Sequence, residues 1–529
     1  MSTNLLVLGI DAANPTLLRR WADEGKLPAI RALIDRGISG LVRGIKGFFI
    51  GSTWPSFYTG LNPAGHGFYR IDQLRSGTYD FFRPLDAPNG IGGIPFWKIA
   101  SDAGQQVAVL DVPLSRLDPD LNGLQIVEWG SHDAVFGFQA SSPEVARDLM
   151  VKVGAYPMPT DCDRERKTVA EFEEFVKGLE QAAAKKADLT IDVLGRRAWD
   201  MLIQVFTESH CVGHQCWHIH DPSHPAHDPQ LLEGLGDPLE RVYMAIDRAV
   251  AAILAKAGSN HVLLVSAHGM SHYRGAQFLL SEILFRLGVT ARPSIKPPGS
   301  SSGGGRLVAV ARRGWGWLPE GVRAAIRPPR SIFAGQHPDQ ALSHLGVDVY
   351  RSRCFAIPNG FPVGGIRLNI SGREPYGILS PGREAEVFCA ELANDLRAIR
   401  DERTGRPLIA EVYRTDDLYS GARRDALPDL LIEWDSAEPI GTLAHANGRH
   451  ATLRATSSKI GIVEGSNAWG RTGEHIPVGT FVFAGPHVLD CKISEPVSVM
   501  DFHPSICKLM GLAAPDVDGK VIDRLIAAA

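Results

Sequence analysis

The stretch NLLVLGID, residues 4–11, decides the fold class of this chain. It is a short run of apolar residues that ends on the carboxylate of Asp11. A short apolar run without polar alternation is typical of a strand that is buried on both faces, as in a parallel sheet. Three later segments have the same form: WDMLIQVFTESH at 199–210, HVLLVSAHGM at 261–270 and GTFVFAGPHV at 479–488.

Helical patterns separate these strands, for example PTLLRRWADEGKLPAIRALIDRG at 15–37 and DPLERVYMAIDRAVAAILAKAG at 237–258. Strands that alternate with helices predict an α/β fold, a doubly wound and mostly parallel sheet flanked by helices. In such sheets ligands bind at the carboxyl ends of the strands. The polar residues expected at that edge are Asp11, His210, His268 and, just before the last strand, His475.

Two regions are predicted to be insertions into this fold. Residues 135–197 are charged and helical in pattern, which predicts a helical cap. Residues 291–335 are rich in Pro, Gly, Ser and Arg, which predicts a flexible loop or lid. The remaining segments, 1–134, 198–290 and 336–529, then form the catalytic core.

Composition limits the partners of the chain. It has 529 residues, 44% of them hydrophobic, and a net charge of −4 with a pI near 6.5, which favours neither nucleic acid nor an anionic membrane as a partner. Its seven cysteines are odd in number and form no CxxC pair, so we expect neither a disulfide framework nor a thiolate zinc site. The N-terminus lacks a signal-peptide pattern, and no apolar run reaches the ~20 residues of a membrane span. We therefore expect a cytoplasmic protein that acts on a small molecule.

The segment FTESHCVGHQCWH, 206–218, carries histidines at 210, 214 and 218. A spacing of four places side chains on one face of a helix, where two imidazoles can hold one transition metal. The alternative is that these are surface or core histidines with local hydrogen bonds. Spacing alone leaves both interpretations open.

Five segments together resemble the type I phosphodiesterase and nucleotide pyrophosphatase branch of the alkaline phosphatase superfamily, in the order in which that family has them. They are GIDAANP at 9–15, TWPSFYTGLNPAGHGFY at 53–69, FTESHCVGHQCWH at 206–218, VSAHGM at 265–270 and RTGEHIPVGTFVFAGP at 471–486. The resemblance covers nearly the whole chain and implies an alkaline-phosphatase-like fold.

It also implies a two-metal hydrolase that displaces a group at phosphorus or sulfur through a covalent intermediate. In this family one metal is held by an Asp, a His and a distant His. The other is held by the first-strand Asp, an Asp-His pair and the oxygen of a Ser or Thr nucleophile. Two cations clamp the attacking and leaving oxygens and neutralise the growing charge.

This chain departs from the family pattern in both metal sets. Residue 210 is histidine where the family has aspartate, so His210, His214 and His475 would form a site of three neutral imidazoles, which suits zinc. Ala267 stands where the family has the aspartate of its Asp-His pair. The second metal would keep Asp11 and His268, so we expect it to be weakly bound or absent.

The nucleophile is the third departure. The family's usual distance before Thr59 falls on Ile50, which has no group that can attack. Thr53 begins a Thr-x-Pro pattern and is the predicted nucleophile, with Ser52 as the next candidate. The alternative is that both hydroxyls are helix caps.

We therefore expect a metal-dependent hydrolase of a phosphodiester or phosphomonoester, with one tightly bound zinc or, in its place, manganese or iron. One alternative is a single-zinc enzyme that uses metal-bound water on a bond other than a phosphate ester. Another is a binding protein that keeps the fold without turnover. His132 could face the pocket, and a solvated-loop position is favoured for it.

Overall fold

The computed structural model describes residues 3–132, 134–158, 164–258, 261–293, 345–445, 451–488 and 490–528. From residue 294 onward, the predicted lid at 291–335 lies outside the described residues. Among the described residues, no helix combines the length and the apolar character that crossing a bilayer requires.

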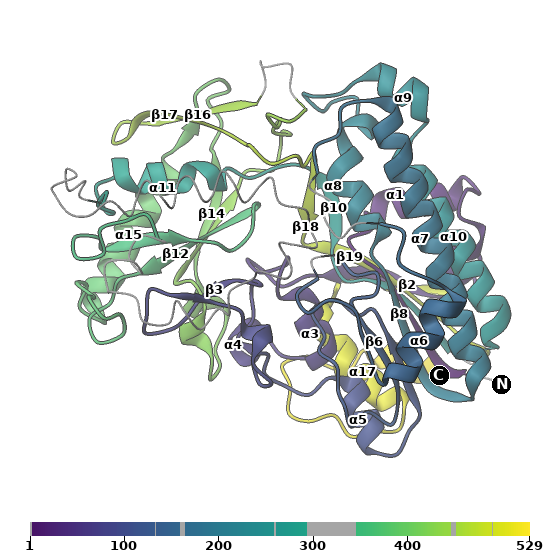
Figure 1. The fold of residues 1–529 in the computed structure, drawn as a ribbon. Coiled ribbons are helices and arrows are strands. Elements are labelled where there is room, and N and C mark those ends of the chain that lie inside the picture. Colours follow the sequence, from purple (N-terminus) through teal and green to yellow (C-terminus); the bar gives the residue numbers. More distant parts are fainter. Residues whose placement is uncertain are drawn as a thin grey trace, which may run out of the picture.

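A ten-stranded sheet forms the larger lobe of the molecule (Figure 1). Its strands, in order, are β20 (Cys491–Lys492), β2 (Gly37–Arg43), β19 (Val478–Ala484), β9 (His261–Ser266), β1 (Thr3–Ile10), β8 (Trp199–Phe206), β5 (Val107–Leu110), β6 (Gly123–Val127) and β7 (Gln139–Ala140), with β21 (Val497–Ser498) beside β2. The five strands from β9 to β6 run parallel to one another. The predicted α/β architecture with a mostly parallel sheet is confirmed.

Strand β19 differs from the pattern expected of it, because it runs antiparallel to both β9 and β2. A continuous apolar run reports burial on both faces and carries no information on direction. The reversal matters for the site. The start of β19, and His475 just before it, lie at the same edge as the carboxyl ends of β1, β8 and β9.

Both faces of the sheet are covered by helices, as strand β1 illustrates. Leu6 and Leu8 belong to the core on one face, and Leu5 and Val7 belong to the core on the other. The first face is covered by α1 (Pro15–Asp23), α2 (Pro28–Ile34), α7 (Val169–Arg196), α8 (Glu208–His220), α9 (Pro229–Leu235) and α10 (Pro238–Ala257). The second is covered by α3 (Thr53–Thr59), α5 (Phe96–Asp102), α17 (Phe502–Leu509) and α18 (Asp523–Ala528). Burial of each leucine stabilises the fold by about 1.5–3 kcal/mol. Because the side chains of β1 alternate between the two faces of the sheet, they pack against the helices on both sides.

The predicted cap segment at 135–197 is helical over α6 (Pro143–Lys152) and α7. Helix α7 begins with a capping box between Thr168 and Glu171 and contributes apolar residues such as Phe172 to the main core. It packs on α10 and β8. Part of this segment is therefore integral to the core, while the division of the chain into a core and two insertions stays a prediction.

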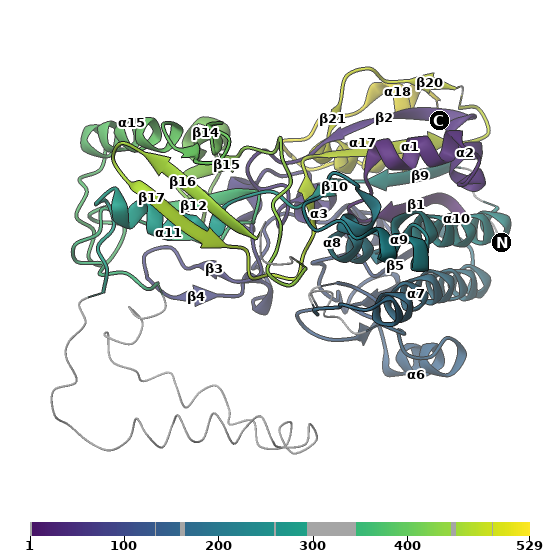
Figure 2. The same cartoon turned by 90° about the horizontal axis from the view of Figure 1, so that it is seen from above.

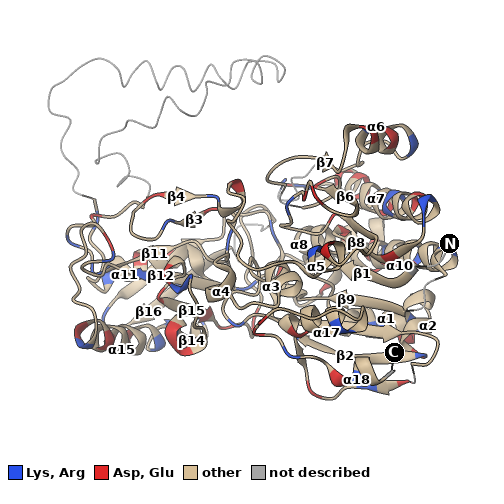
Figure 3. Ribbon diagram, turned by 90° about the horizontal axis from the view of Figure 1, so that it is seen from below, with Lys and Arg blue, Asp and Glu red and all other residues tan. Residues whose placement is uncertain are grey.

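A smaller lobe lies beside the sheet (Figure 2). It contains an antiparallel sheet of β11 (Cys354–Ile357), β12 (Val363–Leu368), β15 (Leu430–Trp434) and β14 (Ile409–Arg414), flanked by α11 (Gln277–Arg286) and α15 (Arg383–Arg397). A three-stranded sheet of β13 (Arg400–Asp401), β16 (Thr452–Ser457) and β17 (Gly461–Ser466) completes it. Outer helices such as α15 carry both acidic and basic residues (Figure 3).

A short antiparallel pair, β10 (Gly269–His272) with β18 (Gly473–Ile476), lies at the carboxyl edge of the main sheet. In this pair Met270 is opposite His475. His268 precedes Met270 by two positions, so the pairing brings His475 close to His268. Remaining short elements are α4 (Pro63–His66), α16 (Thr415–Leu418), β3 (Gln73–Leu74) and β4 (Phe81–Phe82).

Candidate metal centre and active site

Helix α8 starts directly after strand β8 and presents two of the predicted histidines to the carboxyl edge of the sheet. His210 and His214 are one turn apart on α8, and both are buried. The third, His475, reaches the same point from β18. Residues 265 positions apart in sequence therefore meet in one cluster.

The three imidazoles turn the same nitrogen toward a common point. The Nε2 of His210 lies 3.0 Å from the Nε2 of His214 and 3.0 Å from the Nε2 of His475. Tetrahedral ligation with metal–nitrogen bonds of ~2.0–2.1 Å places two ligand nitrogens about 3.3 Å apart. The observed spacing therefore fits a transition metal, and we name these three residues the histidine half of the site.

The backbone of β18 sets the orientation of His214. Its Nδ1 lies 2.8 Å from the carbonyl oxygen of Gly473, so Nδ1–H donates and Nε2 carries the lone pair. Gly473 is required by this close approach, since a Cβ there would lie 2.1 Å from the carbonyl oxygen of Gly213. The backbone N–H of Thr472 also donates to the carbonyl oxygen of His214, at 2.7 Å.

Burial favours the neutral form of two of these rings, His210 and His475. Burial, followed by the neighbouring imidazoles, lowers the pKa of His210 and of His475 well below the usual value of 6.5. Neutral imidazoles have a lone pair to offer a metal. The donor set thus fits a divalent transition metal on chemistry as well as on distance.

A second group lies beside the first and contains the other predicted ligands, Asp11 and His268. The Asp11 carboxylate is 3.9 Å from the Nδ1 of His210 and 3.9 Å from the Nε2 of His268. One of its oxygens accepts a hydrogen bond of 2.8 Å from the indole N–H of Trp54. We name Asp11, His268 and the residues around them the Asp11 half of the site.

The Asp11 half does not fit a second tightly held metal. Ala267 is fully buried and belongs to an apolar core cluster, where a third donor would be needed. Ile50 faces the same cavity with an apolar side chain. Within the described part of the chain, no third histidine, cysteine or carboxylate completes a metal-binding group with Asp11 and His268. Hard cations require several oxygen ligands, and one carboxylate is present.

The two predicted nucleophiles are placed differently from the predicted ligands. The hydroxyl of Ser52 donates to the carbonyl of Phe68 at 2.7 Å, and that of Thr53 donates to the carbonyl of Phe49 at 2.6 Å. Both residues are fully buried. The structure therefore brings together the five predicted ligands and does not bring either hydroxyl to the cavity.

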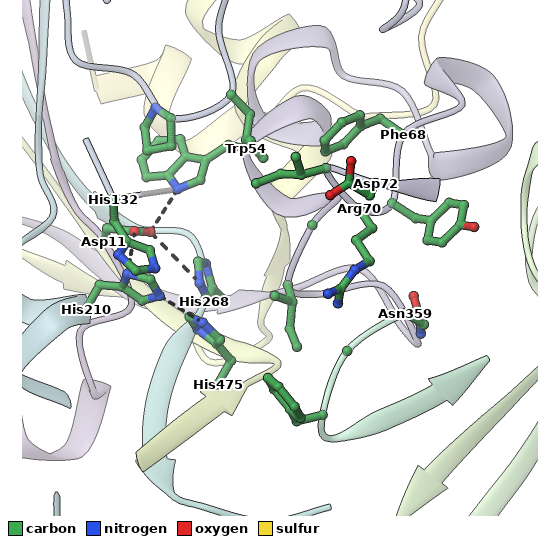
Figure 4. A pocket seen from close by; sticks show the side chains of 18 of the residues that line it. Asp11, Trp54, Phe68, Arg70, Asp72, His132, His210, His268, Asn359 and His475 are labelled. Carbon is green, nitrogen blue, oxygen red and sulfur yellow. Dashed lines mark hydrogen bonds and ion pairs between the residues drawn. The ribbon is translucent and has the colours of Figure 1, made fainter. Parts of the chain in front are cut away.

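A cavity of about 400 Å³ opens above the two halves, between the sheet edge and the smaller lobe. Figure 4 shows Asp11, His210, His268 and His475 on one side and Arg70 on the other. The lining of the cavity also includes Trp54, Asp72, Arg83, His132, Asn359, Phe361, Trp469, Arg471 and Glu474.

Sequence reasoning misplaced or missed three of these residues. His132 lines the cavity with its ring 4.1 Å from that of His210, so the pocket-facing alternative, which the sequence did not favour, describes its position. The hydrogen bond from Trp54 to Asp11 and the position of Arg471 were not predicted. Both lie in segments that resemble the family, at TWPSF and RTGEH, and a charged residue four positions before His475 was the available signal.

The fold and the site define an α/β protein with a histidine-rich centre at the carboxyl edge of its sheet. The sequence profile of the family described as type I phosphodiesterase / nucleotide pyrophosphatase matches residues 5–437. The chain belongs to this family and is a phosphodiesterase-like hydrolase. His475 lies beyond the matched residues, so its place in the site comes from the structure.

Among curated proteins, none matches the chain. Two solved structures of murine ectonucleotide pyrophosphatase/phosphodiesterase 5 are similar to it at 12% identity. One, an inactive form in complex with AMP, covers 98% of both chains with a TM-score of 0.45, and the other covers 100% of both with 0.44. Scores this low do not define a shared fold, so the family assignment rests on the sequence profile.

Proposed function

We propose that this chain hydrolyses a phosphodiester or phosphomonoester of a small molecule, with one divalent transition metal held by His210, His214 and His475. The observation that carries the proposal is the convergence of three Nε2 atoms, 3.0 Å apart in two of the pairs, beside the cavity. A nucleotide-type substrate agrees with the family. Zinc is the proposed metal, with manganese or iron as alternatives.

When bound, the metal supplies a Lewis acid that polarises a phosphoryl oxygen and offsets transition-state charge. The chain contributes the geometry. The Gly473 carbonyl fixes the tautomer and plane of His214, and imidazole ligands add no negative charge of their own to the cation. This orientation requires no rearrangement at the moment of reaction.

The role proposed for the Asp11 half is to hold and orient the side chains beside the metal position. The N–H of Trp54 holds one oxygen of the Asp11 carboxylate, and that carboxylate lies 3.9 Å from both His210 and His268. Asp11 thereby fixes negative charge beside two cavity-lining imidazoles. Occupancy of this half by a second metal is proposed to be weak, because Ala267 offers no ligand.

Water is the proposed attacking group. The hydroxyls of Ser52 and Thr53 are engaged by backbone carbonyls, and neither residue lines the cavity. Their assignment as nucleophiles stays a prediction. It is tested with Ser52→Ala and Thr53→Ala, singly and together. Turnover within tenfold of the parent in the folded double variant supports water, whereas a loss on the order of 10³ or more assigns a covalent role.

The proposed activity is tested on protein stripped with a chelator and reloaded with zinc, manganese or iron. Bis(4-nitrophenyl) phosphate and 4-nitrophenyl phosphate serve as probes for diester and monoester hydrolysis. The parent should turn over at least one of them, and His214→Ala should not. His487→Ala is the matched control, because His487 is exposed and does not line the cavity. Turnover by His214→Ala at the parental rate would refute the assignment.

A further inference from the structure

Cys211 and His132 form a second group of metal-binding side chains next to the histidine half. The sulfur of Cys211 lies 3.8 Å from the Nδ1 of His132, and the ring of His132 lies 4.1 Å from that of His210. The donor atoms of these three residues all lie within 4.8 Å of one another. Sequence spacing does not indicate this group, since His132 precedes Cys211 by 79 positions. The fold therefore gathers one cysteine and two histidines around a common point.

The distances within the group suit a transition-metal site that contains a thiolate. Tetrahedral zinc with a sulfur ligand at ~2.3 Å and a nitrogen ligand at ~2.0 Å places the two ligand atoms about 3.5 Å apart. The 3.8 Å between the sulfur of Cys211 and the Nδ1 of His132 is close to this value. Thiolate ligands favour zinc, and the chemically similar cadmium, over magnesium or calcium. The group therefore fits a thiophilic divalent cation in place of the thiol proton.

His210 belongs to both groups and has one ring nitrogen for each. Its Nε2 faces the other two rings of the histidine half. Its Nδ1 is buried and has no hydrogen-bond partner within the described part of the chain. The Asp11 carboxylate is 3.9 Å from this atom, which is longer than a hydrogen bond. The group can be reached by ions, because His132 lines the cavity and both His132 and Cys211 are half-buried.

We propose that His132, Cys211 and His210 form a second, weaker binding position for a thiophilic divalent cation, beside the histidine half. The inference goes beyond the proposed hydrolysis and does not depend on it. Two protons must leave for solvent when the position fills, one from the Cys211 thiol and one from the His210 ring, which then bridges two cations. Because these losses weaken binding, the position fills in excess metal and empties during purification without added metal.

The test adds cadmium to zinc-loaded protein and follows the ultraviolet charge-transfer band of a cadmium–thiolate bond. The histidine half contains no sulfur, so a cation bound there gives no such band. The parent should show a band that saturates at one cadmium per chain. Cys211→Ser should abolish the band, and His132→Gln should raise the cadmium concentration at half-saturation at least about tenfold. Cys491→Ser is the matched control, because Cys491 is also a half-buried free cysteine, and it should match the parent.

The inference is overturned if the parent gives no band in excess cadmium, if Cys211→Ser keeps the parental band, or if Cys491→Ser loses it. Melting temperatures show whether each variant is folded. If Cys211→Ser does not fold, His132→Gln decides, and half-saturation at the parental cadmium concentration in that variant refutes the inference. The band reports binding and not turnover. A parent that hydrolyses no ester can therefore still confirm the inference, and an active parent without the band refutes it.

Discussion

The histidine half and the Asp11 half of the site lie within one cavity but are built differently. In the first, three buried imidazoles turn their Nε2 atoms to one point, and the Gly473 carbonyl orients one of them. In the second, a carboxylate and an imidazole stand 3.9 Å apart, with an indole N–H on the carboxylate and a buried methyl group, that of Ala267, beside them.

The proposed one-metal site follows from this difference, set against the two-metal pattern that the family resemblance implies. Replacing a carboxylate by His210 keeps a ligand and changes its charge, so the first position is retuned. Replacing a carboxylate by Ala267 would remove a ligand, so the second position is proposed to hold a cation weakly. The remaining Asp11 carboxylate then acts on the neighbouring imidazoles.

The largest effect should follow from removing ligands of the histidine half. His214→Ala and His475→Ala should each lower kcat/KM by a factor on the order of 10³ or more, because the Lewis acid is lost. Asp11→Asn should cost less, about 10–100-fold, since it perturbs orientation and leaves the metal in place. Steady-state kinetics on zinc-loaded proteins checks this order. Equal losses in the three variants would show that both halves hold metals of equal importance.

A smaller effect is expected when the support of the histidine half is disturbed without touching a ligand. Gly473→Ala places a Cβ 2.1 Å from the Gly213 carbonyl oxygen and must push β18 away from α8. The hydrogen bond that orients His214 would then be lost, and zinc affinity should fall about 10–100-fold. Competition with a chromogenic chelator measures the affinity. Gly461→Ala, at a glycine with open space around it, is a control for alanine in a strand, although its φ of +64° adds local strain. Unchanged zinc affinity in Gly473→Ala would show that the Gly473 carbonyl does not contribute to metal binding.

A feature of the fold or the site could be predicted from sequence when the residues that determine it lie close together in the chain. The apolar run at 4–11 and the i, i+4 pair His210 and His214 are local patterns, and both appear in the structure as predicted. The direction of β19 was not predicted, because its apolar pattern is the same in either orientation. The hydroxyls of Ser52 and Thr53 donate to backbone carbonyl oxygens, and a Thr-x-Pro pattern does not reveal these hydrogen bonds.

Contacts between distant segments were the other gap. Trp54 meets Asp11 across 43 positions, and Arg471 meets His214 across 257. In neither pair does the spacing in the sequence indicate that the two residues are in contact. The cavity-facing position of His132 depends on the loop after β6, which packs beside α8 only in the folded chain.

An intermediate effect concerns stability in acid, where metal loss and unfolding must be separated. Burial lowers the pKa of His66 to about 3, whereas the unfolded chain protonates it near 6.5. Below pH 6.5 the unfolded state therefore binds more protons, and stability falls as pH falls, by about 2 kcal/mol between pH 6.5 and 5 from this residue. The metal-free protein should show this loss in urea titrations. His66→Gln, which lacks the titrating ring, should show a smaller pH dependence, and an identical slope would exclude His66 as its source.

The smallest effect should follow from repairing the Asp11 half. Ala267→Asp restores a carboxylate beside Asp11 and His268 and should raise bound metal from one toward two per chain, at most a twofold change. Ala267→Asn has the same shape without the charge and should stay at one. Because residue 267 is fully buried, melting temperatures are measured on both variants. If both fold and both hold one metal, a missing ligand at 267 is not the reason that the second position is weak.

The central claim, one transition metal held by the histidine half, is tested most directly by elemental analysis of protein purified without added metal. We predict one zinc, manganese or iron per chain in the parent and close to none in His214→Ala and His475→Ala. Two tightly held metals per chain in the parent, or an undiminished metal content in those two variants, would contradict it.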